Sequence, residues 1–101
     1  MKAHKDYLKM AVDEAAAGIR ARDGGPFGAI IVRDGKIIGR GHNCVPSSKD
    51  PTAHAEITAI RDACSREQSP HLTGATLYSN FEPCPMCLAA IYWAHIRHLY
   101  F

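Results

Sequence analysis

The order in which helical and strand-like segments alternate along the 101 residues constrains the fold most. Asp34-Gly35 is a two-residue hairpin turn signal that accepts positive φ, and the segments before and after it predict strands at about 27–33 and 36–43. Two further strands are predicted at about 75–81 and 97–101, each after a helical segment. A hairpin followed by two strand–helix–strand crossovers predicts an α/β fold, a three-layer α-β-α sandwich with a mixed sheet.

Three helices are expected to cover the faces of this sheet. An amphipathic pattern predicts the first over about residues 3–22, and the second is predicted over about 53–66 with Thr52 as its N-cap. The third, over about 84–95, is apolar almost all round and is expected to be buried on most sides. Residues 46–51 are expected to form a loop. The residues expected to face the core from the first two helices are Leu8, Val12, Ala15 and Ile19, and Ile57, Ile60 and Cys64.

The composition predicts one globular domain over residues 1–101. Apolar residues make up 47% and charged residues 22%, which excludes a disordered, collagen-like or coiled-coil chain. The longest apolar stretch, 84–96, is shorter than the roughly 18 residues of a membrane-spanning helix, and no apolar segment follows the N-terminus as in a secretory signal. We therefore expect a cytoplasmic protein with no membrane partner. The net charge of +2 with interspersed signs gives only weak evidence against an RNA partner.

His54, Glu56, Cys84 and Cys87 carry most of the chemical information in the sequence. Zinc prefers imidazole and thiolate ligands, and a catalytic zinc site has three protein ligands and an open fourth position. The two cysteines are three residues apart in the first turn of a predicted helix, whose positive end favours thiolates. His54 begins the other crossover helix, and the two helix starts are expected to meet at the carboxyl ends of the strands. Glu56 then lies beside the metal as a non-ligand that exchanges protons with water.

Two other interpretations of the cysteine pair deserve comparison. A lone C-x-x-C also occurs in redox pairs and in structural zinc sites. A structural site needs a fourth protein ligand, for which the candidates are Cys44, Cys64 and the remaining histidines, but none of them forms a second ligand pair. The combination of H-x-E with P-C-x-x-C therefore favours a zinc hydrolase.

These motifs make the chain resemble the cytidine deaminase-like superfamily from about residue 6 to residue 101. Residues 50–56, Asp-Pro-Thr-Ala-His-Ala-Glu, resemble both guanine deaminases and bacterial tRNA adenosine deaminases. Residues 82–87, Glu-Pro-Cys-Pro-Met-Cys, together with 90–94 and 24–29, look more like guanine deaminases. The resemblance implies the cytidine deaminase-like fold and hydrolytic deamination of guanine to xanthine and ammonia.

The resemblance also implies a role for the metal-centre residues. His54, Cys84 and Cys87 are expected to bind one Zn²⁺ per chain with a bound water or hydroxide, and Glu56 is expected to be the catalytic proton shuttle. Two alternatives stay open: a tRNA adenosine deaminase with the same centre, and a zinc-stabilised fragment without catalytic activity. The first predicts tRNA binding that weakens steeply with salt, and the second predicts bound zinc without turnover.

The expected substrate is a small purine base. By the same resemblance Asn43 hydrogen-bonds the purine, Phe27 lines the base pocket, and Ala55 is a further substrate-binding residue. A homodimer is expected as well. His42 and Cys44 flank Asn43 and are expected to be exposed strand residues rather than part of the cleft.

The sequence departs from the deaminase pattern in two respects. Relatives commonly have a small or thiol residue before Glu-Pro-Cys, where this chain has Phe81. We expect Phe81 to pack within a strand; the alternative is that it narrows the pocket. Similar deaminases also continue for about fifty residues beyond the corresponding point. We therefore expect a C-terminally incomplete domain that lacks the last strand or strands and the C-terminal helices.

Overall fold

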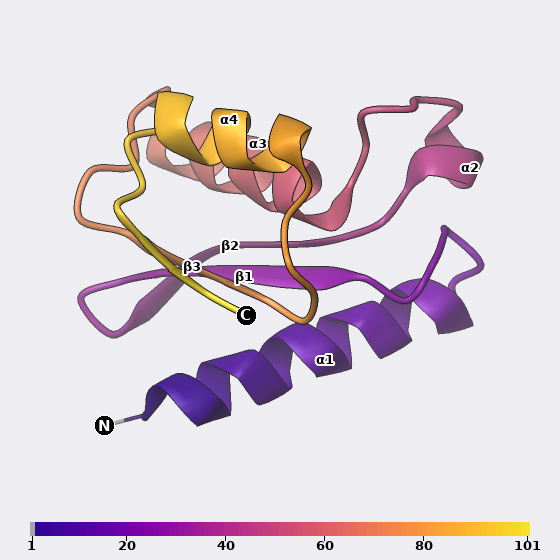
Figure 1. Cartoon of the computed structure of the whole chain (residues 1–101), viewed down its shortest axis with the longest axis horizontal. Helices are drawn as coiled ribbons and strands as arrows, with labels where there is room; N and C mark the ends of the chain where they lie inside the picture. The colour runs from indigo at the N-terminus through magenta and orange to yellow at the C-terminus, as the bar shows by residue number, and fades with distance from the viewer. Residues whose placement is uncertain (1) are drawn as a thin grey trace.

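The computed structural model of the chain describes residues 2–101 and shows a four-stranded sheet between two layers of helices (Figure 1). Helix α1 lies on one face, and α3 and α4 lie on the other. The predicted three-layer α/β architecture is therefore confirmed. The helices are α1 (His4–Arg20), α2 (Val45–Ser48), α3 (Ala55–Glu67) and α4 (Pro85–Trp93). The strands are β1 (Gly28–Arg33), β2 (Lys36–His42), β3 (Thr76–Ser79) and β4 (His98–Tyr100).

The sheet is mixed, as predicted, with the strand order β2-β1-β3-β4. Strand β1 pairs antiparallel with both β2 and β3, and β3 pairs parallel with β4. The hairpin between β1 and β2 turns at Asp34 and Gly35, which have φ values of 51° and 74°, as the turn signal requires. Helices α3 and α4 form the two crossovers, so both begin near the ends of strands β2 and β3.

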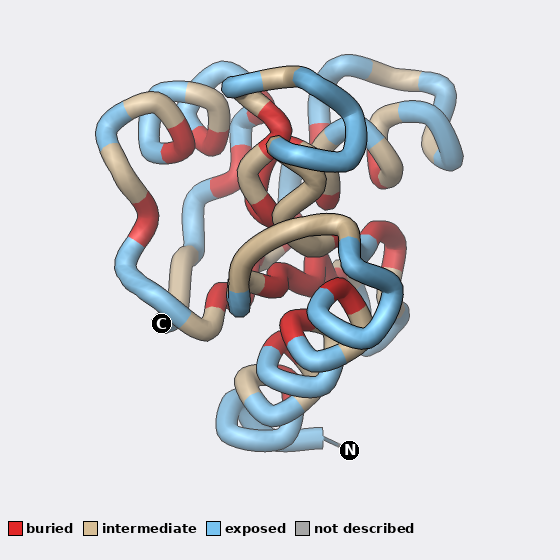
Figure 2. The backbone as a smooth tube through the Cα atoms, turned by 90° about the vertical axis from the view of Figure 1, so that its right-hand side faces the viewer, coloured by how far each residue is buried: buried red, intermediate tan, exposed pale blue. Residues whose placement is uncertain are grey.

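Helix α1 buries only part of the predicted apolar stripe: Ala15 is buried and Leu8 is half-buried against the core, as predicted. Its buried positions are Tyr7, Ala11, Ala15 and Gly18. Val12 and Ile19, predicted to face the core, are 53% and 48% exposed. Figure 2, in which α1 begins at the label N, shows how buried and exposed residues alternate around its turns. Small side chains let the helix approach the sheet closely. The helix is therefore rotated so that Ala11, Ala15 and Gly18 face the sheet, and Val12 and Ile19 face the solvent.

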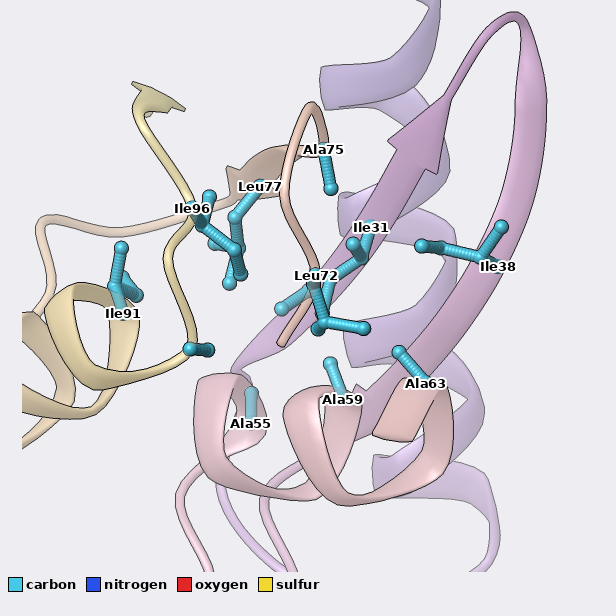
Figure 3. Packing of buried hydrophobic residues seen from close by; sticks show 12 residues of the cluster. Ile31, Ile38, Ala55, Ala59, Ala63, Leu72, Ala75, Leu77, Ile91 and Ile96 are labelled. Atoms are coloured by element: carbon cyan, nitrogen blue, oxygen red, sulfur yellow. The ribbon is translucent and has the colours of Figure 1, made fainter. Parts of the chain in front are cut away.

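The main core lies between the sheet and helices α3 and α4 (Figure 3). Alanines of α3 face the large side chains of β1, β3 and the loop before β3, among them Ile31, Leu77 and Leu72. Of the residues predicted on this face of α3, Ile57 is buried, while Ile60 and Cys64 are half-buried and pack against the same cluster. A smaller cluster on the opposite face joins α1 to β1 and β3.

The close contact between α3 and β2 depends on Gly41. A Cβ atom at this position would lie 2.2 Å from Thr58 Oγ1 and 2.5 Å from the backbone nitrogen of Ala59. No side chain fits in that space. Thr58 Oγ1 also donates to the His42 carbonyl at 3.0 Å, which fixes the first turn of α3 against the end of β2.

Three local predictions were wrong. Residues 45–48 form the short helix α2 instead of a loop, since Pro46 occupies one of its first positions. Helix α3 begins two residues later than expected, with His54 as the N-cap in place of Thr52, whose hydroxyl donates to Asp50. Helix α4 is buried only at Cys87 and Ile91, while its Leu88, Tyr92 and Trp93 are exposed. Within residues 2–101, no helix is long and apolar enough to cross a membrane.

Candidate metal centre and adjoining pocket

The ends of two helices bring His54, Cys84 and Cys87 together. His54 is the N-cap of α3 and Cys84 is the N-cap of α4, and both have extended backbone conformations. Pro85 follows Cys84 at the start of α4, where its fixed φ favours helix initiation. Cys87, in the first turn of α4, is fully buried. The sequence placed these residues correctly at two helix starts.

The three side chains have the geometry of a zinc site. His54 Nδ1 lies 3.6 Å from Cys84 Sγ and 3.6 Å from Cys87 Sγ. A tetrahedral zinc ion with bonds of about 2.0 Å to nitrogen and about 2.3 Å to sulfur holds these two kinds of atom about 3.5 Å apart. One imidazole nitrogen and two sulfurs also have the softness that zinc prefers. The residues present therefore fit a zinc ion with three protein ligands.

Glu56 stands next to this cluster in the first turn of α3 and is only 7% exposed. Burial raises the pKa of the Cys87 thiol, and the neighbouring Glu56 carboxylate and Cys84 thiol raise this pKa further. Negative charge on sulfur is therefore disfavoured when no cation is near. A divalent cation among these groups would reverse that effect and favour the thiolate.

A pocket of about 220 Å³ opens beside the cluster. Its wall includes every residue predicted to bind the metal, to bind the substrate or to act in catalysis, except Cys87. Cys87 is fully buried. The lining residues are Phe27, Asn43, His54, Ala55, Glu56, Phe81, Glu82 and Cys84. Asn43 Oδ1 accepts a hydrogen bond from the Val45 backbone nitrogen at 3.1 Å, so its NH₂ group is the part that can donate to a ligand.

Phe81 and Glu82 also line the pocket; for Phe81 this was the less favoured of two interpretations of the sequence, and Glu82 had been given no role there. Phe81 was predicted to pack within a strand, but β3 ends at Ser79 and the Phe81 side chain is 63% exposed. Its ring meets Phe27 edge-on, with ring centroids 5.7 Å apart and planes at 72°. The feature of the sequence that indicated a place for Phe81 at the pocket was the presence of a bulky residue directly before Glu-Pro-Cys.

His42 joins three segments next to Asn43, contrary to the prediction that it is an exposed strand residue. Its Nδ1 lies 2.7 Å from Glu14 Oε2 on α1, and its Nε2 lies 2.7 Å from Asp23 Oδ2 after α1. Gly18 makes room for the ring, because a Cβ there would lie 2.7 Å from two of its atoms. Burial lowers the pKa of His42, but the hydrogen bonds and charges of the two carboxylates outweigh burial and raise the pKa overall.

Cys44 completes a second group of potential ligand atoms with Asp23 and His42. It is half-buried rather than exposed, and burial, followed by the charge of Asp23, raises the pKa of its thiol. Both nitrogens of His42 already face carboxylate oxygens at hydrogen-bond distance. The arrangement is therefore an ion-paired histidine, not a second metal centre.

Comparison with known proteins agrees with the geometry. Residues 1–101 match the family model described as the cytidine and deoxycytidylate deaminase zinc-binding region. The chain belongs to this deaminase family. Guanine deaminase from Bacillus subtilis is 53% identical over 98 residues, which are 97% of this chain and 63% of that protein. The tRNA-specific adenosine deaminase from Aquifex aeolicus is 46% identical over 97 residues, 94% of this chain and 62% of that protein.

The solved structures extend this deaminase relationship to the fold. The crystal structure of the Bacillus subtilis guanine deaminase superposes with a TM-score of 0.95 at 52% identity and covers 98% of this chain. The predicted cytidine deaminase-like fold is therefore confirmed. This chain spans less than two thirds of the length of these relatives. Membership of the deaminase family supports a zinc hydrolase, and both guanine and tRNA deaminases are close relatives.

Proposed function

We propose that this chain carries the zinc centre of an enzyme that hydrolyses guanine to xanthine and ammonia. The observation that carries the proposal is the convergence of His54, Cys84 and Cys87 beside the buried carboxylate of Glu56, at the wall of one pocket. The 53% identity to a guanine deaminase supports guanine over tRNA adenosine, for which the Aquifex aeolicus enzyme is 46% identical.

In the proposed reaction His54, Cys84 and Cys87 hold one zinc ion. Zinc bound by such a ligand set would lower the pKa of its bound water to about 7 and so supply a nucleophile at neutral pH. The structural interpretation of the same cysteines would need a fourth protein ligand. Beside His54, the start of α3 contributes the Glu56 carboxylate to the pocket lining. A carboxylate at this position suits proton transfer and favours a catalytic site over a closed structural one.

Glu56 is proposed as the group that moves protons. A water oxygen forms a bond to C2 of guanine while Glu56 accepts a proton from that water. Glu56 gives this proton to the ring nitrogen N3, then takes the remaining proton from the new hydroxyl on C2 and passes it to the departing amine. The C2–N bond breaks, ammonia leaves, and C2 keeps the oxygen as the carbonyl of xanthine. Burial of Glu56 strengthens its interactions with these changing charges because little water competes.

Asn43, Phe27 and Ala55 are proposed to hold the base. The Asn43 NH₂ group, left free by the hydrogen bond that its oxygen accepts from Val45, donates to an acceptor atom of the purine ring. The Phe27 ring provides an apolar wall for the flat face of the base. Ala55, with its small side chain next to Glu56, leaves room for the reacting carbon.

The test is the conversion of guanine to xanthine by the zinc-loaded chain, followed by ultraviolet absorbance. Turnover that vanishes in Glu56→Gln, with zinc content unchanged, is the expected result. Glutamine keeps the size of Glu56 and removes its ability to accept a proton. Full activity in this variant would refute the proton-shuttle role.

Two alternatives to guanine deamination remain if guanine is not converted. The similarity to tRNA-specific adenosine deaminases supports adenosine in tRNA as a second candidate, to be tested with an anticodon stem-loop over a range of salt concentrations. Because the chain spans 63% of the guanine deaminase it matches, a zinc-stabilised domain without turnover is the third. It predicts one bound zinc and no conversion of either substrate.

The predicted homodimer is to be tested by sedimentation. Tyr92 and Trp93 on α4, which are exposed, form the surface to alter by substitution.

A further inference from the structure

Phe81 is exposed although a phenylalanine gains stability from burial. Its side chain is 63% exposed at the mouth of the pocket and does not belong to either core cluster. Phe81 and Phe27 together form an aromatic surface in the lining of this pocket, and exposed apolar surface beside a pocket is typical of a ligand site.

The backbone around Phe81 is held firmly in place. The buried Ser79 side chain donates from Oγ to the Phe81 carbonyl at 2.7 Å, and the Phe81 nitrogen donates back to Ser79 Oγ at 3.2 Å. This pair of hydrogen bonds fixes the direction in which the segment leaves β3. The backbone of Phe81 is therefore fixed beside the pocket that its side chain lines.

The same segment is attached to the backbone on both sides of Phe27. Asn80 Oδ1 accepts from the Gly28 nitrogen at 2.9 Å, and Asn80 Nδ2 donates to the Pro26 carbonyl at 2.9 Å. Asn80, the residue before Phe81, is thus hydrogen-bonded to the residues on both sides of Phe27. The edge-on contact of the two rings is set by this bracing, so the pair forms a preorganised aromatic entrance.

The charge at the entrance is unsuited to a phosphate backbone. Glu82 follows Phe81, is exposed and lines the same pocket as Glu56. The eight described lining residues include two carboxylates and neither lysine nor arginine. Proteins that bind nucleic acid strands contact the phosphates mainly through lysine and arginine, whereas Glu82 would repel them.

We propose that Phe81, braced against Phe27 and followed by Glu82, is a specificity-determining residue that favours a free aromatic base over the same base on a phosphodiester strand. This inference rests on the proposed function, whose site it shares. Phe81 contributes a stacking surface to the free base. On a strand, the flanking phosphates meet this ring and the Glu82 carboxylate, and neither offers them a hydrogen-bond donor.

The test uses two fluorescent probes, free 2-aminopurine and an RNA stem-loop with 2-aminopurine in its loop, at one fixed salt concentration. Binding to the zinc-loaded chain is followed by quenching of the fluorescence. Phe81→Ala is expected to weaken binding of the free base about tenfold. Binding of the stem-loop is expected to stay the same or to become tighter. The matched control is Phe101→Ala, which removes another exposed phenylalanine, 61% exposed, that does not line the pocket.

Equal effects of Phe81→Ala on both probes, or no effect on either, would overturn the inference. Conversion of guanine is measured on the same preparations. If guanine is converted but discrimination between the probes does not depend on Phe81, the inference fails and the proposed function stands. If discrimination depends on Phe81 but guanine is not converted, the inference is supported and the proposed function fails.

Discussion

Replacing His42 with glutamine should destabilise the chain by an amount that depends on pH. In the folded protein protonated His42 donates to both Glu14 and Asp23 at 2.7 Å. A glutamine side chain at this position has one NH₂ group and can replace one of these donors. The perturbation therefore removes one charge-assisted hydrogen bond and leaves one carboxylate without its partner.

The magnitude follows from the burial of the three side chains. A hydrogen bond to a charged group stabilises a protein by about 1.5–3 kcal/mol. The side chains of Glu14, His42 and Asp23 are 14%, 20% and 32% exposed, so water screens the Asp23 pair most and the lower end of this range applies. We expect His42→Gln to lower the free energy of unfolding by about 1.5 kcal/mol at pH 6. For a domain of about 100 residues this corresponds to a melting temperature lower by about 5–10 °C.

The sign of the pH dependence follows from the raised pKa of His42 in the folded state. A raised pKa means that the folded protein binds the proton more tightly than the unfolded chain does. The stability from this proton is therefore complete below the unfolded pKa of about 6.5, and it is lost as the pH rises through the folded pKa. Neutral imidazole donates only one hydrogen bond, so deprotonated His42 loses one of its two donated bonds. The difference between the wild type and His42→Gln should consequently shrink between pH 6 and pH 9.

Urea unfolding at pH 6 and pH 9, with the same zinc concentration throughout, measures this difference directly. Effects of pH on the metal ligands and on other carboxylates occur in both proteins and cancel when the two are subtracted. A difference that is the same at both pH values, or larger at pH 9, would show that protonated His42 does not contribute in this way. Gly18→Ala provides an independent check, because its Cβ would push against the His42 ring and should reduce the same pH-dependent contribution.

Two further predictions concern the metal centre and the packing of α3. A chelator should lower the melting temperature of the zinc-loaded chain, because zinc that binds only the folded state stabilises it by about 2.7 kcal/mol at a hundred times its dissociation constant. Cys84→Ser should lose most of this chelator effect; an unchanged effect would argue against Cys84 as a ligand. Gly41→Ala should destabilise the chain by about 2 kcal/mol, since its Cβ would overlap Thr58 and the backbone of Ala59. Gly35→Asn, at an open turn position with positive φ, is the control and should have little effect on thermal unfolding.

The candidate metal centre was predictable because its geometry is mostly local. Cys84 and Cys87 are three residues apart at a helix start, so one turn of α4 brings their sulfurs to the same side. His54 is distant in sequence, but the crossover topology brings the start of α3 to the start of α4. The element order therefore carried enough information to predict both the sheet and the meeting of these three side chains.

The buried face of α1 was only partly predictable from the spacing of its apolar residues, since Leu8 and Ala15 face the core as predicted and two larger residues do not. Periodicity shows that a helix is amphipathic, but small residues also form contact faces when a helix lies close to a sheet. Ala11, Ala15 and Gly18 face the sheet and the His42 ring, while Val12 and Ile19 remain exposed. Shape complementarity between helix and sheet decided the orientation, and that property appears only when the two surfaces meet.

The sequence by itself thus determined the element order, the hairpin turn and the set of candidate zinc ligands. Tertiary structure decided which side chains surround them. Phe81 looked like a strand residue but stands at the pocket entrance, because hydrogen bonds of Ser79 and Asn80 turn the chain at the end of β3. His42 looked exposed but joins Glu14 and Asp23, which come from a helix and a loop far away in the sequence. Hydrophobic spacing and motifs encode local geometry, whereas the partners of a polar or pocket residue depend on which distant segments the fold brings beside it.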